Sequence, residues 1–288
     1  MIFGANGFVG NYLYVKSLRQ GFEVIGYDSK VMENMIKPID ISNSEAVNSE
    51  IKRFRPDWVV NTAAISNIDF AEAHKELAWL INVKSNQEMA RICREHGSRF
   101  MVFSSDAVFR GDALKYDENS PTDPVNYYGY TKAEAEKAIL ALIPEATIIR
   151  ISLVLGFPVE SGNSFLVDFN KKLTYGETIE LSTEEIRTPI EVGTLTECCL
   201  ELMTVDFEGI IHLGSSDSLS RYKIGLKYAI KAGFDKALLV PASGSTPGKA
   251  PRHKRGVLDI SKAANTLETP LLNIKSFIDK IVISKYKI

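Results

Sequence analysis

The first half of the chain alternates short apolar stretches, typical of β-strands, with longer stretches of helical periodicity. The strand candidates are residues 23–27, 58–61, 99–105 and 146–152, and the helix candidates are residues 8–20, 44–54, 74–96 and 127–142. Strands of about five residues separated by helices are typical of βαβ units, whose right-handed crossovers place helices on both faces of a parallel sheet. The sequence therefore predicts an α/β fold with a doubly wound parallel sheet.

After about residue 153 this alternation becomes less regular. Helical patterns return at residues 192–204, 220–232 and 271–285, whereas residues 245–256 read as a loop with a basic cluster. We expect a dinucleotide-binding domain over residues 1–153 and a smaller, partly discontinuous substrate-binding region over residues 154–288. The chain is expected to return to the first domain around residues 187–212.

The composition argues against several classes of partner. The 34 Lys and Arg residues nearly balance the 36 Asp and Glu residues, which gives no reason to expect nucleic acid or an anionic membrane. Apolar runs such as residues 237–240 are far too short to span a bilayer, and the first ten residues do not resemble a signal peptide. Cys93, Cys198 and Cys199 make a poor disulfide framework, so we expect free, buried thiols in a reducing cytoplasm. The four histidines show no metal-ligand spacing.

Three glycines near the start, Gly4, Gly7 and Gly10, precede or enter the first helix candidate. Glycines let a backbone approach a pyrophosphate closely, and a helix N-terminus supplies N–H groups and a favourable dipole. The spacing departs by one residue from the usual dinucleotide pattern, and only residues 1–3 remain for the preceding strand. Either further residues precede Met1 in the native strand, or the sheet tolerates a short strand. We predict that Met1 to Phe3 pair in the middle of the sheet.

Two aspartates are candidate cofactor contacts. Asp28 follows the second strand candidate, where a carboxylate would bind a ribose 2′-hydroxyl and repel a 2′-phosphate. It therefore favours NAD over NADP, although nearby Lys30 weakens that preference, and a solvated Asp at a strand end is the alternative. Asp40 is a candidate for the adenine side, with the capping of helix 44–54 as its alternative, a role that Ser42 or Ser44 would also serve.

Tyr128 and Lys132 are a candidate catalytic pair. They are four residues apart and therefore share one face of the predicted helix, a spacing that Tyr127 and Tyr130 do not have. A neighbouring ammonium lowers the pKa of a phenol, which then exchanges a proton with a carbonyl oxygen while hydride moves at the carbon. This spacing is also common by chance on surface helices.

Hydroxyl groups are expected opposite the tyrosine. Ser104, Ser105 and Asp106 lie at the end of a strand candidate, and ligands of open α/β sheets lie at the carboxyl ends of the strands. Capping or turn formation is the alternative for each serine.

Together these stretches resemble the extended short-chain dehydrogenase/reductase family, and within it the branch of dTDP-4-dehydrorhamnose reductases, called RmlD-like. The matching segments follow the order of the family over nearly the whole chain. They are residues 4–10, 40–42, 61–72, 81–86, 103–111, 126–136, 150–156, 187–195, 209–216 and 250–263. The resemblance implies a Rossmann fold, NAD or NADP, a nucleotide-sugar substrate in carbohydrate biosynthesis and, as an open question, a homodimer.

The resemblance also implies roles for particular residues. The catalytic residues would be Ser105, Tyr128 and Lys132. The cofactor residues would be Gly4, Asn6, Gly7, Phe8, Val9, Gly10, Asp28, Asp40, Ile41, Ala63, Ala64, Ser104, Tyr128 and Lys132. The substrate residues would be Ser105, Asp106, Arg187 and Arg252, and Asn82 would be a structural asparagine behind the site. No metal is implied.

The chain departs from the family pattern at three positions. Ala107 replaces an aromatic residue, His253 replaces the proline after Arg252, and Arg110 stands where an acidic residue is common. These changes leave the chemistry intact and leave the particular sugar open.

The implied activity is reduction of a nucleotide-linked 4-keto-6-deoxy sugar. Two alternatives stay open: an epimerase or dehydratase of the same superfamily, and a non-catalytic, cofactor-binding subunit that resembles the β subunit of methionine adenosyltransferase.

Overall fold

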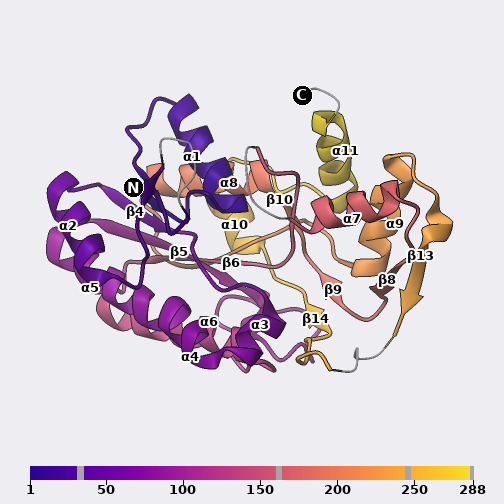
Figure 1. Cartoon of the computed structure of the whole chain (residues 1–288), viewed down its shortest axis with the longest axis horizontal. Helices are drawn as coiled ribbons and strands as arrows, with labels where there is room; N and C mark the ends of the chain where they lie inside the picture. The colour runs from indigo at the N-terminus through magenta and orange to yellow at the C-terminus, as the bar shows by residue number, and fades with distance from the viewer. Residues whose placement is uncertain (31–35, 160–163, 244–247, 286–288) are drawn as a thin grey trace.

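A seven-stranded parallel sheet forms the centre of the molecule (Figure 1). The computed structural model describes residues 1–30, 36–159, 164–243 and 248–285. The strands of this sheet are β1 (Ile2–Phe3), β2 (Gly26–Asp28), β3 (Lys37–Pro38), β4 (Trp58–Asn61), β5 (Arg99–Ser105), β6 (Thr147–Ile151) and β11 (Gly209–Leu213). They lie in the order β11-β6-β5-β4-β1-β2-β3, and every neighbouring pair is parallel. The predicted doubly wound α/β fold is confirmed.

The two-residue strand β1 lies in the middle of this sheet, as predicted. Ile2 pairs with Gly26 of β2 on one side and with Val60 of β4 on the other. The strand order changes direction between β1 and β4, and in doubly wound sheets this switch point opens the crevice in which ligands bind.

Helices cover both faces of the sheet and bury two separate apolar clusters. One face packs against α1 (Phe8–Arg19), α8 (Val192–Thr204) and α10 (Ser261–Thr266), and the other against α2 (Ser44–Phe54), α5 (Ser85–His96) and α6 (Tyr127–Leu142). Ile2 and Phe3 point to opposite clusters, as the two-residue period of a strand requires. Cys93, Cys198 and Cys199 are buried, free thiols in these clusters, as expected.

A smaller region lies at the opposite end of the molecule from α2 and α5 (Figure 1). Its apolar core lies between α7 (Phe165–Thr174), α9 (Arg221–Lys231), α11 (Ile274–Lys285) and the paired strands β8 (Ile179–Ser182) and β13 (Leu239–Ala242). Short pairs join this region to the sheet: β7 (Val154–Leu155) with β10 (Ile190–Glu191), and β9 (Ile186–Arg187) with β12 (Leu219–Ser220) and β14 (Arg255–Gly256). The predicted division into residues 1–153 and 154–288 stays a prediction.

Several boundaries differ from the sequence-based expectation. The second strand is Gly26–Asp28 rather than 23–27, and the helix expected over 74–96 is α4 (Lys75–Trp79), a π-helix (Leu80–Lys84) and α5. Sequence patterns missed α3 (Ile68–Ala73), α7 and two 3₁₀ turns, Asp106–Val108 and Lys236–Leu238. Part of the predicted loop 245–256 lies outside the described residues, and its last two residues form β14.

Among the described residues, none of the helices combines the length and the apolar character that crossing a bilayer requires.

Candidate functional site

A cavity of about 1250 Å³ opens at the carboxyl edge of the sheet, where the strand order changes direction. Its walls come from the glycine loop, the ends of β2, β4, β5 and β6, the start of α6, and the β9, α9 and β14 segments. The cavity is lined by every residue predicted for the site, namely Gly4, Asn6, Gly7, Phe8, Val9, Gly10, Asp28, Asp40, Ile41, Ala63, Ala64, Ser104, Ser105, Asp106, Tyr128, Lys132, Arg187 and Arg252. The structure therefore brings the predicted residues together, while their individual roles stay predictions.

The glycine loop fits the shape that a bound pyrophosphate requires. Gly4 has a φ of +79°, and a Cβ on Gly10 would lie 2.1 Å from the carbonyl oxygen of Gly4. A larger side chain at Gly4 would be strained, and one at Gly10 would collide with the turn from which α1 starts. No side chain in the described part of the chain caps α1 at Gly7, so its first N–H groups remain available for an anion at the cavity wall.

Asp28 and Asn6 form one corner of the predicted cofactor half. The Asp28 carboxylate accepts hydrogen bonds from the backbone N–H of Asn6, at 3.1 Å, and of Lys30, at 2.9 Å. The Asn6 amide donates to the carbonyl oxygen of Lys30 at 3.0 Å. These bonds fix a carboxylate at the end of β2, where a ribose diol would bind.

Asp40 does not cap α2, and neither do Ser42 or Ser44. Asp40 accepts hydrogen bonds from the N–H and the hydroxyl of Ser42, at 2.9 and 2.8 Å. The cap is Asn43, whose Oδ1 accepts from the N–H of Ala46. Asp40 therefore lies in a separate turn at the cavity wall.

Close packing at the start of α6 places Tyr128 beside Ser105. A Cβ on Gly129 would lie 2.0 Å from the carbonyl oxygen of Ala107, so only glycine lets this helix approach the turn after β5 so closely. Asn126 caps the helix by accepting from the N–H of Gly129 at 2.9 Å. Ser105 in turn hydrogen bonds to Tyr128, and that bond acts to lower the pKa of the phenol.

Burial dominates the pKa of both members of the Tyr128–Lys132 pair. It raises the pKa of Tyr128 to about 12 against the opposing hydrogen bond from Ser105, and nearby Asp106 raises it further. Burial likewise lowers the pKa of Lys132 to about 8, while the Glu136 carboxylate acts in the other direction. The expected lowering of the Tyr128 pKa by Lys132 is therefore wrong for this structure. The Lys132 ammonium donates to the carbonyl oxygen of Phe103 at 2.9 Å and lies 6.0 Å from the centre of the Tyr128 ring.

A buried ion pair lies behind the catalytic candidates. Arg150 binds Glu136 through two hydrogen bonds, of 3.0 and 2.6 Å, and both side chains are almost fully buried. The Ser104 hydroxyl donates to the same carboxylate, so it is directed at Glu136. The predicted cofactor role of Ser104 stays a prediction.

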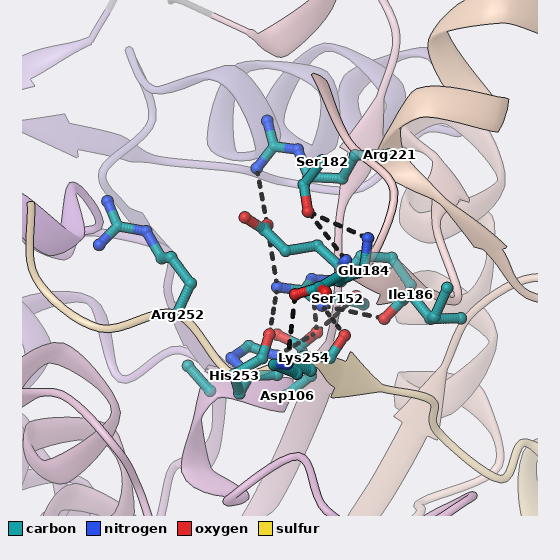
Figure 2. Close-up of polar contacts among 12 residues, drawn as sticks. Asp106, Ser152, Ser182, Glu184, Ile186, Arg221, Arg252, His253 and Lys254 are labelled. Carbon is teal, nitrogen blue, oxygen red and sulfur yellow. Dashed lines mark hydrogen bonds and ion pairs between the residues drawn. The ribbon is translucent and has the colours of Figure 1, made fainter. Parts of the chain in front are cut away.

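Asp106 is the centre of a buried polar cluster (Figure 2). The cluster lies in the predicted substrate half of the cavity, the part lined by Ser105, Arg187 and Arg252. One of the Asp106 oxygens accepts a hydrogen bond from Ser152 at 2.6 Å and lies 3.1 Å from Nε2 of His253 and 3.6 Å from Nε of Arg187. Burial acts to raise the pKa of Asp106, but nearby His253 and Arg187, together with the hydrogen bond from Ser152, lower it to about 2. Asp106 is therefore an ionised carboxylate next to Ser105.

The three departures from the family pattern lie in different surroundings. His253 belongs to the Asp106 cluster, and Ala107 lines the cavity beside it. Arg110 is exposed and pairs with Asp123 at 2.6 Å. Only the first two therefore shape the substrate half of the cavity.

Asn82 lies in the π-helix and connects three segments behind the site. Its side chain accepts from the N–H of Ile65 and donates to the carbonyl of Ile65 and to the hydroxyl of Thr131. These bonds join the loop after β4 to α6, in agreement with the structural role that was expected. Short π-helical segments are frequent beside functional sites.

Sequence reasoning missed several polar residues that line the cavity, namely Ser29, Thr62, Ser66, Ser152, Glu185 and Arg221. The Thr62 hydroxyl bonds to the carbonyl oxygens of Phe3 and Gly4, and its place directly after β4 could have indicated it. No local pattern marks Glu185 or Arg221, because the pairing of β9 with β12 brings them to the cavity.

Within the residues that the structure describes, no three or more His, Cys, Asp or Glu side chains are grouped so as to hold a metal ion.

Comparison with known proteins identifies relatives along nearly the full chain. The family model described as the RmlD substrate binding domain matches residues 1–286. A probable low-salt glycan biosynthesis reductase of Haloferax volcanii is 30% identical over 276 residues, covering 92% of this chain and 90% of that protein. The β subunit of methionine adenosyltransferase 2 from Xenopus laevis is 27% identical over 269 residues, covering 91% of this chain and 80% of that protein.

A solved structure confirms the fold. The dTDP-4-dehydrorhamnose reductase of Bacillus anthracis, in complex with NADP, superimposes with a TM-score of 0.90 at 24% identity, covering 98% of each chain.

Proposed function

The chain belongs to the RmlD substrate binding domain family, and from that premise we propose that it is an NAD(P)-dependent reductase of a nucleotide-linked 4-keto-6-deoxy sugar. The observation that carries the proposal is that Ser105, Tyr128 and Lys132 line one cavity together with the glycine loop. The reductase name of the archaeal relative supports the same class of reaction.

Within the proposed reaction, the glycine loop, Asp28 and Asp40 hold the dinucleotide, and its reduced nicotinamide supplies a hydride. The buried phenol of Tyr128 is protonated at neutral pH, because its pKa is about 12. It is therefore in the form that donates a proton to the oxygen of a ketone under reduction. The Ser105 hydroxyl holds that oxygen, and the Lys132 ammonium would bind the ribose next to the nicotinamide.

The test is a turnover assay with NADH or NADPH and a dTDP-linked 4-keto-6-deoxy sugar, followed by UDP- and GDP-linked analogues. We expect oxidation of the reduced cofactor with formation of one equivalent of the 4-hydroxy sugar. Tight, non-exchanging NAD with no net oxidation would instead indicate an epimerase or dehydratase.

A non-catalytic subunit is the second candidate, and the relative from Xenopus laevis is the observation that favours it. If no sugar supports cofactor oxidation and a partner enzyme copurifies with the chain, this candidate replaces the reductase. The Ser105, Tyr128 and Lys132 side chains in one cavity favour turnover.

We expect the rate of reduction to fall as the pH rises past about 8. The pKa of Lys132 is about 8, so its ammonium is present below that pH and is lost above it, whereas Tyr128 stays protonated until about pH 12. Profiles of kcat/KM against pH measure the effect. The Lys132→Arg variant keeps its positive charge at high pH, so the activity that it retains should not fall above pH 8. A profile of the unsubstituted protein that stays flat to pH 10 would contradict the assignment.

Cofactor choice should depend on Asp28. Replacing its carboxylate in Asp28→Asn removes a charge that repels a 2′-phosphate, so the preference should shift by about tenfold towards NADPH, equivalent to about 1.4 kcal/mol. The ratio of kcat/KM for NADH and NADPH measures this. Asp40→Asn is the matched control and should leave that ratio unchanged; an equal shift in both variants would refute the role of Asp28.

A further inference from the structure

Arg187, the arginine expected to bind substrate, has its donor groups directed at the protein. Its Nη1 donates to the carbonyl oxygens of Ile186 and Lys254, at 2.9 and 3.2 Å. Its Nη2 donates to Glu185 at 3.2 Å and to the carbonyl of His253 at 3.0 Å, and its Nε lies 3.6 Å from Asp106. A guanidinium has five N–H groups, so four of them are in hydrogen bonds within the protein and the fifth, on Nε, faces the Asp106 carboxylate at ion-pair distance.

Arg221 has a different environment. It is the first residue of α9, its side chain is 33% exposed, and it lines the cavity. The polar contact that the structure gives its guanidinium is an ion pair with Glu185 at 3.7 Å, beyond hydrogen-bond length, and the guanidinium also lies over the Phe165 ring. Its N–H groups are therefore available to an anion in that part of the cavity.

Arg252 approaches the same cavity from the segment before β14, and Figure 2 shows it on the other side of the view from Arg221. It pairs with Asp69 at 2.9 Å and donates to the carbonyl of Ala250 at 2.7 Å, which leaves part of its guanidinium for another partner. Arg221 and Arg252 line the same cavity, and the positive charges of Arg187 and Arg252 help burial lower the pKa of Arg221 against the opposing charge of Glu185. An anion between them would relieve that repulsion.

We propose that Arg221 is a substrate-binding residue, which with Arg252 clamps the diphosphate of the substrate, and that Glu185 pairs with Arg221 when no substrate is bound. The inference rests on the proposed function, because a nucleotide sugar brings the diphosphate. Charge-assisted bonds from two guanidinium groups match the several oxygens of a diphosphate. Arg187 then has a positioning role: it ties the segment before β14 to β9 and holds Asp106.

The pairing of β9 with β12 brings Glu185 between Arg187 and Arg221, where it can compete with a diphosphate. Arg187 of β9 pairs with Leu219 of β12, and the N–H of Arg221 donates to the carbonyl of Glu185 at 3.0 Å. The Glu185 carboxylate thus lies between the two arginines, 3.2 Å from Arg187 and 3.7 Å from Arg221. Binding of a diphosphate competes with this carboxylate for Arg221, so the two residues should have opposite effects on affinity.

The test is calorimetric titration with dTDP, UDP and GDP in the presence of saturating NAD⁺, which keeps the nucleotide out of the cofactor half. We expect Arg221→Gln to weaken binding of the preferred nucleotide by about 10- to 100-fold and Glu185→Gln to strengthen it by a few fold. Binding of the nucleoside without phosphates should be unchanged in Arg221→Gln. Arg110→Gln, which removes an exposed arginine away from the cavity, is the matched control and should bind as the unsubstituted protein does.

The outcomes separate this inference from the proposed function. If the unsubstituted protein binds none of the three nucleotides, the proposed function fails and the inference fails with it. If it binds one of them and Arg221→Gln binds that nucleotide equally well, the clamp is refuted and the reductase proposal stands. If Glu185→Gln weakens binding as much as Arg221→Gln does, Glu185 supports the site instead of competing with substrate, and that half of the inference is refuted.

Discussion

Replacing Tyr128 by phenylalanine is expected to reduce kcat for ketone reduction by about 10²- to 10⁴-fold. The substitution removes only the phenol oxygen, which hydrogen bonds to Ser105 beside the cavity, and keeps the ring that packs at the start of α6. Without that oxygen no group in the same position donates a proton to the reduced ketone. Cofactor oxidation with the nucleotide-linked keto sugar measures the loss, and titration with NADH should show cofactor binding within a few fold of the unsubstituted protein.

Tyr130→Phe is the matched control. Tyr130 lies two residues further along the same helix but is 42% exposed, and its ring stacks on Trp79 outside the cavity. Its substitution should leave kcat unchanged. Equal losses in both variants would show that the helix, rather than the Tyr128 hydroxyl, determines activity, and full activity of Tyr128→Phe would refute the proposed proton donor.

The parts of the site that sequence patterns predicted are those set by local spacing. Tyr128 and Lys132 share a helix face because they are four residues apart, and Gly7 and Gly10 stand where α1 starts because a Cβ on either would come within 3.1 Å of the Gly4 carbonyl oxygen. The parallel, doubly wound sheet followed from the alternation of strands with helices, and so did the central place of β1. Each of these features depends on residues close together in the chain or on a general rule of topology.

Long-range contacts set the features that the sequence did not predict. The pKa of Tyr128 is raised because α6 buries the phenol against the turn after β5, and no local pattern gives the depth of that burial. Arg187 was expected to contact substrate, yet the segment before β14 supplies two carbonyl oxygens to its guanidinium. Arg221 reaches the cavity through strand pairing between β9 and β12. The side-chain N–H groups that a site offers to a ligand are therefore known only once the fold shows which of them are already bonded within the protein.

Removing Arg150 is expected to destabilise the protein by about 3–5 kcal/mol, because Arg150→Met leaves the Glu136 carboxylate buried without its partner. Both side chains are less than a tenth exposed, and Glu136 keeps only the Ser104 hydroxyl as a donor among the contacts described above. Urea unfolding without ligands measures the free energy. Arg91→Met is the matched control: Arg91 pairs with Glu88 and Glu95 on the exposed face of α5, where solvent screens ion pairs and they contribute little to stability.

The double variant Arg150→Met with Glu136→Leu distinguishes loss of the pair from loss of packing. Replacing a whole buried pair by apolar side chains is often neutral, so the double variant should recover most of the stability and lose mainly the bond from Ser104. The double variant should nevertheless be less active than the unsubstituted protein. Glu136 lies one turn after Lys132, and its charge favours the ammonium form of Lys132. A double variant that is as unstable as Arg150→Met would show that the shape of Arg150, which also covers the Phe109 ring, matters more than its charge.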